Sequence, residues 1–297
     1  MELNKSMVYW KRITNKLKTY GNLVMFSHTL FSLPFAIVSM FLAANGMPKL
    51  SVFFWIGVAF LGARTGANAL NRLVDKDIDA KNPRTLSRQM PSGLVKKTEV
   101  IVLVGISFGT LFLAALMLNP LCVIMLPVAI FLFILYSYTK RFTWACHLVL
   151  GITCGGAPVG AWMAVTGGIS WLCLILGAAN ALWVAGFDII YGSQDVEFDR
   201  KEGLYSIPAV FGIECALLLS SGFHVATLLL LLYVYYLAPM GFVFLIGIGI
   251  IAVLLYKEHR MVSPDNLTNV TIASYGINQI VSVVFLIFSI ADIFLVR

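Results

Sequence analysis

The chain has 297 residues, of which 60% are hydrophobic and 12% are charged, with a formal net charge of +7. A soluble domain carries about 25% charged residues, so this composition excludes an ordinary soluble protein and indicates an integral membrane protein. The apolar runs are long enough to cross a bilayer as helices, which favours an all-α bundle over a barrel.

One membrane domain covering residues 1–297 is predicted, with nine transmembrane helices around a central cavity. The predicted spans are residues 22–45, 50–71, 98–118, 120–138, 144–166, 169–191, 209–232, 237–256 and 269–295. Lys and Arg gather in residues 1–20 and in every second loop, including loops 76–97 and 192–208. By the positive-inside rule, these segments are cytoplasmic and the C-terminus is outside. We therefore expect a multi-pass protein of the bacterial inner membrane. Its positive net charge reflects Lys and Arg in the cytoplasmic loops and does not indicate nucleic-acid binding.

The second predicted span becomes polar towards its cytoplasmic end. Arg64, Asn68, Asn71 and Asp75 follow one another along related faces of this helix. Arg64 lies about two turns further inside the membrane than Asn71, where the acidic cluster begins. Charged side chains within a membrane usually face a cavity, so we expect a site role for Arg64 and not simple snorkelling to the lipid headgroups.

The first acidic cluster lies in the stretch NRLVDKDIDAKNPRTLSRQMP, residues 71–91. Asn71, Asp75 and Asp79 are each four residues apart, which places them on one face of a helix over two turns. Arg84 and Arg88 follow, again four apart. Such charges are costly at the edge of an apolar segment, so the cluster indicates a ligand that stabilises them.

The middle of the chain supplies further polar groups at the same side of the membrane. Tyr136, Tyr138, Lys140 and Arg141 close the fourth span, where the aromatic residues suit the membrane interface and the two cations suit an anion. The fifth span contains GITCGGAPVGAW, residues 151–162, a glycine-rich segment that allows another helix or a ligand to approach closely.

A second cluster repeats the first. Asp188 and Tyr191 lie at the membrane end of the sixth span, and Asp195, Asp199 and Lys201 follow it. The offset from Asp75 to Asp195 equals that from Asp79 to Asp199. Two matched acidic clusters indicate one polar site with pseudo-symmetric halves. The last three spans are nearly featureless, and Asp292 near their outer end is expected at the membrane interface, as is Asp265 in its loop.

The chemistry of the two clusters favours a phosphate ligand. Four aspartates without a nearby His or Cys set suit Mg²⁺ better than zinc, and Mg²⁺ typically binds substrate phosphates together with one or two carboxylates. The neighbouring cations would neutralise the remaining phosphate charge. The sequence has no GxxxxGK[ST] loop, which argues against a nucleoside triphosphatase. A polyprenyl diphosphate, with its tail in the apolar bundle, fits this arrangement.

Four motifs together resemble the UbiA-type intramembrane aromatic prenyltransferases. They are NxxxDxxxD at residues 71–79, RTxxRxxPSG at 84–93, YxxxKR at 136–141 and DxxYxxxDxxxDxKxG at 188–203. The resemblance covers nearly the whole chain. It implies nine helices around a cavity, Mg²⁺ ions bridging the aspartates to the diphosphate, and transfer of the prenyl group to an aromatic acceptor.

The resemblance also implies a role for each residue. The metal and diphosphate site would comprise Asn71, Asp75, Asp79, Asp195 and Asp199. Diphosphate would be bound by Arg84, Arg88, Lys140 and Lys201. Arg141 would meet an acceptor carboxylate, and the acceptor side would further comprise Arg64, Asn68, Tyr136, Asp188 and Tyr191.

The identity of the acceptor stays open between two phenols that carry a carboxylate. One is 4-hydroxybenzoate, used in ubiquinone biosynthesis, and the other is a dihydroxynaphthoate, used in menaquinone biosynthesis. A transporter with an acidic ion site is the alternative of another class, but its acids would be spread through the membrane depth. A lipid-headgroup transferase is a further alternative, but the glycine–alanine–arginine signature that such enzymes usually carry between aspartates is missing from this sequence. Besides membrane lipid and the substrates, no obligate protein partner is implied.

Overall fold

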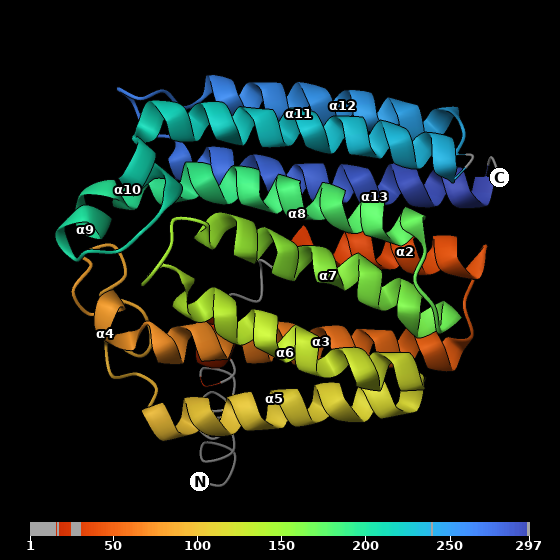
Figure 1. The fold of residues 1–297 in the computed structure, drawn as a ribbon, viewed down its shortest axis with the longest axis horizontal. Coiled ribbons are helices and arrows are strands. Elements are labelled where there is room, and N and C mark those ends of the chain that lie inside the picture. Colours follow the sequence, from red (N-terminus) through yellow and green to blue (C-terminus); the bar gives the residue numbers. More distant parts are fainter. Residues whose placement is uncertain (1–15, 17, 25–30, 239, 296–297) are drawn as a thin grey trace, which may run out of the picture.

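The computed structural model describes residues 16, 18–24, 31–238 and 240–295 of the chain. Short helical segments interrupt a series of long helices in this part (Figure 1). The long helices are α2 (Leu33–Ala44), α3 (Leu50–Val74), α5 (Lys97–Leu118), α6 (Pro120–Thr139), α7 (Cys146–Thr166), α8 (Trp171–Gly192), α11 (Ile213–Leu237), α12 (Phe242–Arg260) and α13 (Asn278–Leu295). The short elements are α4 (Lys76–Asp79), η2 (Ser193–Asp195), α9 (Val196–Lys201), α10 (Ile207–Phe211) and the π-helical η3 (Ile272–Ile277).

The expected all-α, multi-pass architecture is confirmed. Among the described residues, 8 helices are long and apolar enough to cross a membrane, and α2 is a shorter apolar helix of 12 residues. The predicted count of nine spans is therefore close. Residues 25–30, within the first predicted span, lie outside the described residues, as does most of the predicted basic segment 1–20.

The predicted start of the seventh span is wrong by several residues. The sequence is largely apolar from residue 207 onwards, but Ser206 and Pro208 begin the separate short helix α10. Gly212 then adopts φ +85°, a backbone conformation that favours glycine, and α11 begins only at Ile213. Hydrophobicity alone does not reveal this break in the helix.

The packing of the long helices brings the two acidic clusters together. In Figure 1 the long helices lie side by side along one axis, and α4, α9 and α10 gather at the same end of the bundle. Helix α3 packs along α5, α7 packs along α8, and α8 also packs along α11. The polar segments that follow α3 and α8 consequently meet at one end.

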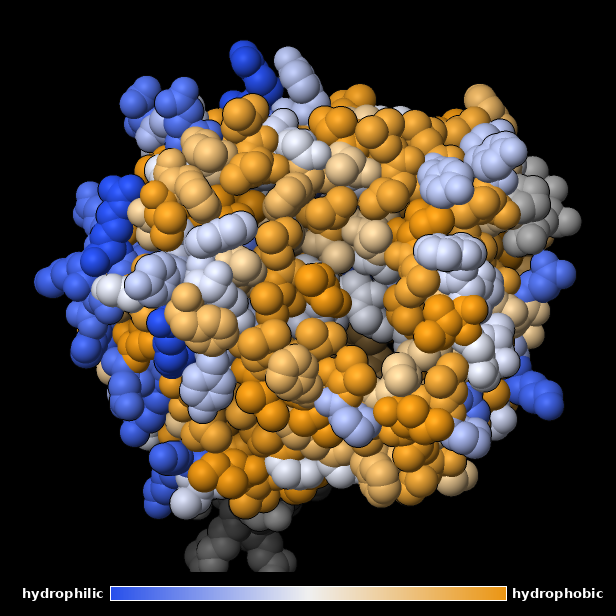
Figure 2. Space-filling view, viewed as in Figure 1, coloured by the Kyte–Doolittle hydropathy of each residue, from blue (hydrophilic) through white to orange (hydrophobic). Residues whose placement is uncertain are grey.

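The molecular surface has the polarity expected for a membrane protein. Figure 2 shows apolar side chains over the middle of the bundle and hydrophilic ones concentrated at the end that carries α4 and α9. Large apolar side chains such as Ile106, Leu116, Leu229 and Val253 are exposed on the long helices. A bilayer is the environment that removes such a belt from water, so the chain is an integral multi-pass membrane protein.

The sequence predicts that a helix or a ligand approaches the glycine-rich part of α7, and in the structure helix α8 does so. A Cβ atom added at Gly151 would collide with the carbonyl oxygen of Ala181, and one added at Gly155 would collide with that of Gly177. Small residues thus allow the two backbones to approach closely along this seam, where a side chain would hold them apart.

Asp292, expected near the outer membrane interface, has a structural role that the sequence did not indicate. Its side chain is fully buried, and its two carboxylate oxygens accept hydrogen bonds from the backbone N–H groups of Gly241 (2.7 Å) and Phe244 (3.0 Å). Asp292 on α13 therefore caps the first turn of α12, where a negative charge is favourable.

Replacing Asp292 with alanine should lower the free energy of unfolding by about 1–3 kcal/mol, because two backbone N–H groups at the start of α12 lose their acceptor. Thermal unfolding of the detergent-solubilised protein measures the change. Asp265→Ala, at an exposed loop position, is the matched control and should be nearly neutral. Equal losses in the two variants would contradict the capping role.

Candidate active site

Both acidic clusters are built on the same local backbone geometry. Helix α3 ends at Val74, and Asp75 adopts φ −89° and ψ 3° before α4 begins. Asp195 adopts φ −101° and ψ 5° before α9 begins. This sparsely populated region of backbone space often holds active-site residues. The prediction of one continuous helix through Asp75 is therefore wrong, although the N–H of Asp79 still bonds to the carbonyl of Asp75 and keeps the spacing.

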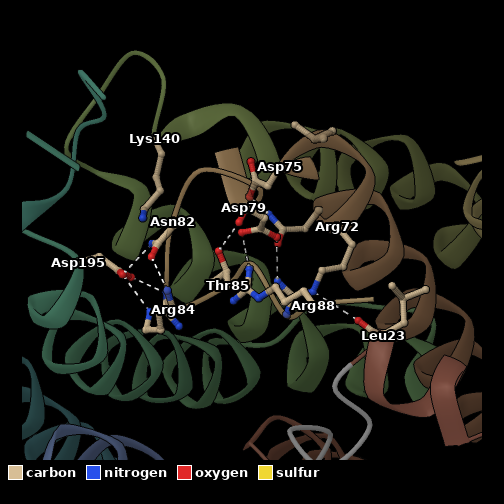
Figure 3. A network of polar contacts seen from close by, with 12 residues as sticks. Leu23, Arg72, Asp75, Asp79, Asn82, Arg84, Thr85, Arg88, Lys140 and Asp195 are labelled. Carbon is tan, nitrogen blue, oxygen red and sulfur yellow. Dashed lines mark hydrogen bonds and ion pairs between the residues drawn. The ribbon is translucent and has the colours of Figure 1, made fainter. Parts of the chain in front are cut away.

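The two carboxylates of the first cluster are each held by arginine. Arg88 Nη1 lies 2.7 Å from Asp79 Oδ1, and Arg72 Nη1 lies 3.9 Å from Asp79 Oδ2. Figure 3 shows both guanidinium groups directed at Asp79. Arg141 Nη2 donates to Asp75 Oδ1 over 2.9 Å, and Asn71 donates to the other oxygen of Asp75.

The second cluster receives its partners from distant parts of the chain. Arg84 forms a two-pronged pair with Asp195 at 2.9 and 2.5 Å, and Asn82 donates to the same carboxylate (Figure 3). Arg84 Nη1 also donates to the Tyr191 hydroxyl at 2.5 Å. Lys140 Nζ lies 3.4 Å from Asp199. The loop after α4 thereby connects the first cluster to the second.

These contacts and burial shift the ionisation of the groups beyond the spanning helices. Burial raises the pKa of the Asp75 carboxyl above its usual range, and the adjacent charge of Arg141 offsets only part of this effect. Burial alone would lower the pKa of the Arg84 guanidinium, but its hydrogen bonds to Asp195 and the charge of that carboxylate outweigh burial and raise it. For Lys140, burial is likewise outweighed by Asp199, and its pKa is raised.

A polar cavity of about 160 Å³ lies between the two clusters. The predicted site residues that line it are Asn68, Asn71, Asp75, Asp79, Arg84, Arg88, Tyr136, Lys140, Asp188, Tyr191, Asp195 and Asp199. Further lining residues that the sequence did not single out include Arg72, Asn82, His147 and Tyr275. Arg72 and Asn82 adjoin the first motif and share its polar pattern, whereas nothing in their spacing links His147 or Tyr275 to it.

An apolar chamber of about 530 Å³ adjoins this polar cavity, and Asn68 and Tyr136 line both. Its walls come from α3, α5, α6, α7 and α8, with smaller contributions from α2. Among the described residues that line the chamber, Arg64 is the one that carries a charge. The sequence-based expectation that Arg64 faces a cavity is consistent with this position.

Two predicted residues lie outside both cavities. Arg141 does not line the polar cavity; it donates to the backbone carbonyls of Ser137 (2.8 Å) and Val74 (3.0 Å) as well as to Asp75. Lys201 is exposed at the end of α9. The arrangement thus gives Arg141 a supporting position behind Asp75 and leaves Lys201 in solvent.

The donor set fits a divalent cation that is shared with a ligand. Within the described part of the chain, no three His, Cys, Asp or Glu side chains are close enough to form a complete cage. Mg²⁺ needs no such cage, because it usually takes one or two carboxylates, water and phosphate oxygens. The buried Oδ2 of Asp79 accepts no hydrogen bond from a described residue, so it has a lone pair to offer such an ion.

Comparison with known sequences identifies relatives along most of the chain. The model of the UbiA prenyltransferase family matches residues 32–283. The 4-hydroxybenzoate octaprenyltransferase of Vibrio campbellii is 31% identical over 214 residues, covering 71% of this chain and 72% of its own length. That of Shewanella sediminis is 35% identical over 205 residues, covering 67% and 71%.

Solved structures of UbiA homologs are also similar to this chain. The apo structure of a UbiA homolog from Aeropyrum pernix K1 has a TM-score of 0.81 and 31% identity, covering 90% of this chain and 98% of its own. A UbiA homolog from Archaeoglobus fulgidus bound to GPP and Mg²⁺ has a TM-score of 0.71 and covers 93% and 99%. At 20% identity, the second likeness concerns the fold alone.

Removal of Arg141 should destabilise the protein, because Asp75 would lose its cationic partner. The side chains are 28% and 20% exposed, so we expect a loss of about 1–3 kcal/mol, below the roughly 3–5 kcal/mol of a fully buried pair. Thermal unfolding of Arg141→Ala, Asp75→Asn and the double variant gives the coupling energy. The double variant should be more stable than additivity predicts, and strict additivity would show that the pair contributes nothing.

Proposed function

Because this chain belongs to the UbiA prenyltransferase family, we propose that it transfers a polyprenyl group from a polyprenyl diphosphate to a ring carbon of a hydroxyaromatic acid. The observation that carries this proposal is the polar cavity adjoining an apolar chamber, with Asn68 and Tyr136 in the walls of both. The names of the curated relatives make 4-hydroxybenzoate, the ubiquinone precursor, the first choice of acceptor. A dihydroxynaphthoate of menaquinone biosynthesis is the alternative, because it offers the same phenol and carboxylate.

The polar cavity supplies what a diphosphate requires. Arg84, Arg88 and Lys140 line it and already face anionic groups. We assign the metal ligands to Asn71, Asp75, Asp79, Asp195 and Asp199. Bound Mg²⁺ would neutralise charge on the diphosphate and so improve it as a leaving group. Arginine can bind phosphate oxygens bidentately, as Arg84 binds the Asp195 carboxylate here.

The boundary between the cavities is where the chemistry would occur. Cleavage of the allylic C–O bond leaves the electron pair on the diphosphate, whose negative charge Arg84, Arg88 and Lys140 stabilise. The remaining allylic cation is positioned beside Tyr136 and Tyr191, whose ring faces attract positive charge. The apolar chamber holds the tail and keeps water from the cation.

The acceptor would approach from the chamber side of this boundary. Arg64 is the charged group there, so we assign it to the acceptor carboxylate, with Asn68 and Tyr136 beside it. Asp188 lines the polar cavity and would receive the phenolic proton. Arg141, which contacts Asp75 instead, would act on the metal side.

The proposed location is a bacterial inner membrane, with the polar end of the bundle in the cytoplasm. The bacterial relatives and the concentration of Lys and Arg in loops 76–97 and 192–208 support this orientation. A cytoplasmic mouth would also give the polar cavity access to water-soluble aromatic acids and to Mg²⁺.

Removal of one metal-binding carboxylate should suppress turnover without unfolding the bundle. Asp75→Asn and Asp195→Asn each keep the side-chain shape but lose a negative charge, so we expect prenyl transfer to fall by about 100-fold or more. Product formation at saturating Mg²⁺ measures the effect. Asp77→Asn, exposed in the same segment, should retain activity, and full activity of both site variants would exclude the metal assignment.

Substitution of Arg64 should act on the acceptor alone. Arg64→Ala removes the charge in the chamber wall, so the KM for the hydroxyaromatic acid should rise about 10-fold or more, whereas the KM for the prenyl diphosphate should hardly change. Arg64→Lys should recover part of the loss. If the diphosphate KM changes and the acceptor KM does not, the assignment is wrong.

The decisive test of the proposed function is product analysis with purified protein, Mg²⁺ and a polyprenyl diphosphate. 4-Hydroxybenzoate and a dihydroxynaphthoate are supplied in parallel reactions. Prenylation of 4-hydroxybenzoate alone is the expected result, and prenylation of the naphthoate alone would replace the acceptor by the alternative. If neither is prenylated while diphosphate is released, the acceptor class is wrong. If the diphosphate stays intact, the transferase proposal itself fails.

A further inference from the structure

Asp188 differs from the other carboxylates of the polar cavity in its partner. The four that face an Arg or Lys are Asp75, Asp79, Asp195 and Asp199. Asp188 on α8 instead meets His147 on α7, with 2.7 Å between its Oδ2 and the imidazole Nδ1. His147 was not among the residues that the sequence indicated, and the proposed reaction gives it no role so far.

The geometry places the imidazole behind the carboxylate. The side chain of Asp188 is 22% exposed and that of His147 only 3%, although both residues line the polar cavity. The imidazole Nε2 is buried and has no hydrogen-bond partner among the described residues. A Cβ added at Gly192 would come within 2.8 Å of the ring Cε1. The ring is therefore held between Asp188 and the backbone of α8, and Gly192 leaves the space that it occupies.

The chemistry of this pair fixes the role of each member. An ionised carboxylate only accepts hydrogen bonds, so opposite it Nδ1 of His147 carries a hydrogen and donates a hydrogen bond to Asp188. A guanidinium or ammonium partner strongly favours the ionised carboxylate and makes it a poorer proton acceptor. The imidazole instead orients the carboxylate through a single hydrogen bond to Oδ2, which leaves the other carboxylate oxygen to take up a proton and release it again.

We propose that His147 is a positioning residue that holds the Asp188 carboxylate toward the acceptor phenol. This inference rests on the proposed function. In the reaction, the C–O bond of the prenyl diphosphate breaks with its electron pair on the diphosphate, and the ring carbon forms the new C–C bond. The phenolic proton passes to Asp188 as the oxygen becomes a carbonyl. Loss of the ring proton to solvent restores the aromatic ring, and Asp188 returns its proton to the oxygen, so one proton is released per turnover.

Three variants distinguish a positioning role of His147 in the reaction from a purely structural role in the fold. His147→Ala removes the donor. His147→Gln retains a neutral N–H donor of similar reach. His224→Ala is the matched control, because His224 is equally buried at 2% exposure and lines neither cavity. Its imidazole contacts His259 and the carbonyl of Trp183 instead.

Kinetic measurements on the full-length protein provide the first readout. We expect His147→Ala to lower kcat by about 10- to 100-fold, the usual effect of losing a group that orients a functional one. The KM for the prenyl diphosphate should stay within about 2-fold, because the donor site is untouched. His147→Gln should recover most of kcat, and His224→Ala should lose thermal stability but keep kcat. Wild-type kcat in His147→Ala would overturn the proposal.

A spectroscopic readout separates this inference from the proposed function. In protein labelled with ¹⁵N-histidine, the Nδ1–H resonance of His147 is assigned by its loss in His147→Gln. It should shift in Asp188→Asn if the two side chains are hydrogen-bonded, and an unmoved resonance would overturn the pairing. If the wild-type protein prenylates neither acceptor, the proposed function fails, and the kcat part of the inference fails with it. The resonance then still decides whether His147 holds Asp188.

Discussion

Charge compensation at one end of an apolar bundle is the constraint on which the rest of this structure depends. Carboxylates that leave water lose several kcal/mol of hydration unless a cation replaces it. Here the cations come from other elements: Arg84 reaches Asp195 from the loop after α4, and Lys140 reaches Asp199 from the end of α6. Because each pair joins separate segments, the pairs also hold the short helices against the long ones. The same cations are those that a diphosphate would require, so the proposed ligand site and its scaffold form one network.

Under the proposed function, the two cavities would serve opposite physical requirements. Ion binding needs polar groups and access to water, whereas a reactive carbocation must be protected from water. The structure places these environments next to each other, and the wall common to both is short, formed by Asn68 and Tyr136. Asn68 donates to the carbonyl of Val24 over 2.6 Å, which fixes one side of this boundary. The polarity changes here within the length of one or two side chains.

The sequence was most informative where regular spacing carries the information. The four-residue steps from Asn71 to Asp79 and the repeated offset grouped residues that line one cavity in the structure. It was least informative about contacts set by packing. Arg141 follows Lys140 directly, yet its side chain turns back to the carbonyl groups at the ends of α3 and α6, and such groups lack partners within their own helix. Asp292 is likewise paired with a backbone segment 51 residues away, which no local pattern shows.

The close seam between α7 and α8 has a consequence for engineering a different substrate range. On α7, His147 lies one helical turn before Gly151. On α8, Asp188 lies one turn after Ala185, and the Cβ of Ala185 would contact a side chain introduced at Gly151. A larger residue in the seam would therefore change the separation of these two side chains as well as that of the backbones. Helices α3 and α6 contribute to the chamber wall without belonging to this seam. Their chamber-facing side chains are positions where pocket shape can be changed without placing a larger residue between α7 and α8.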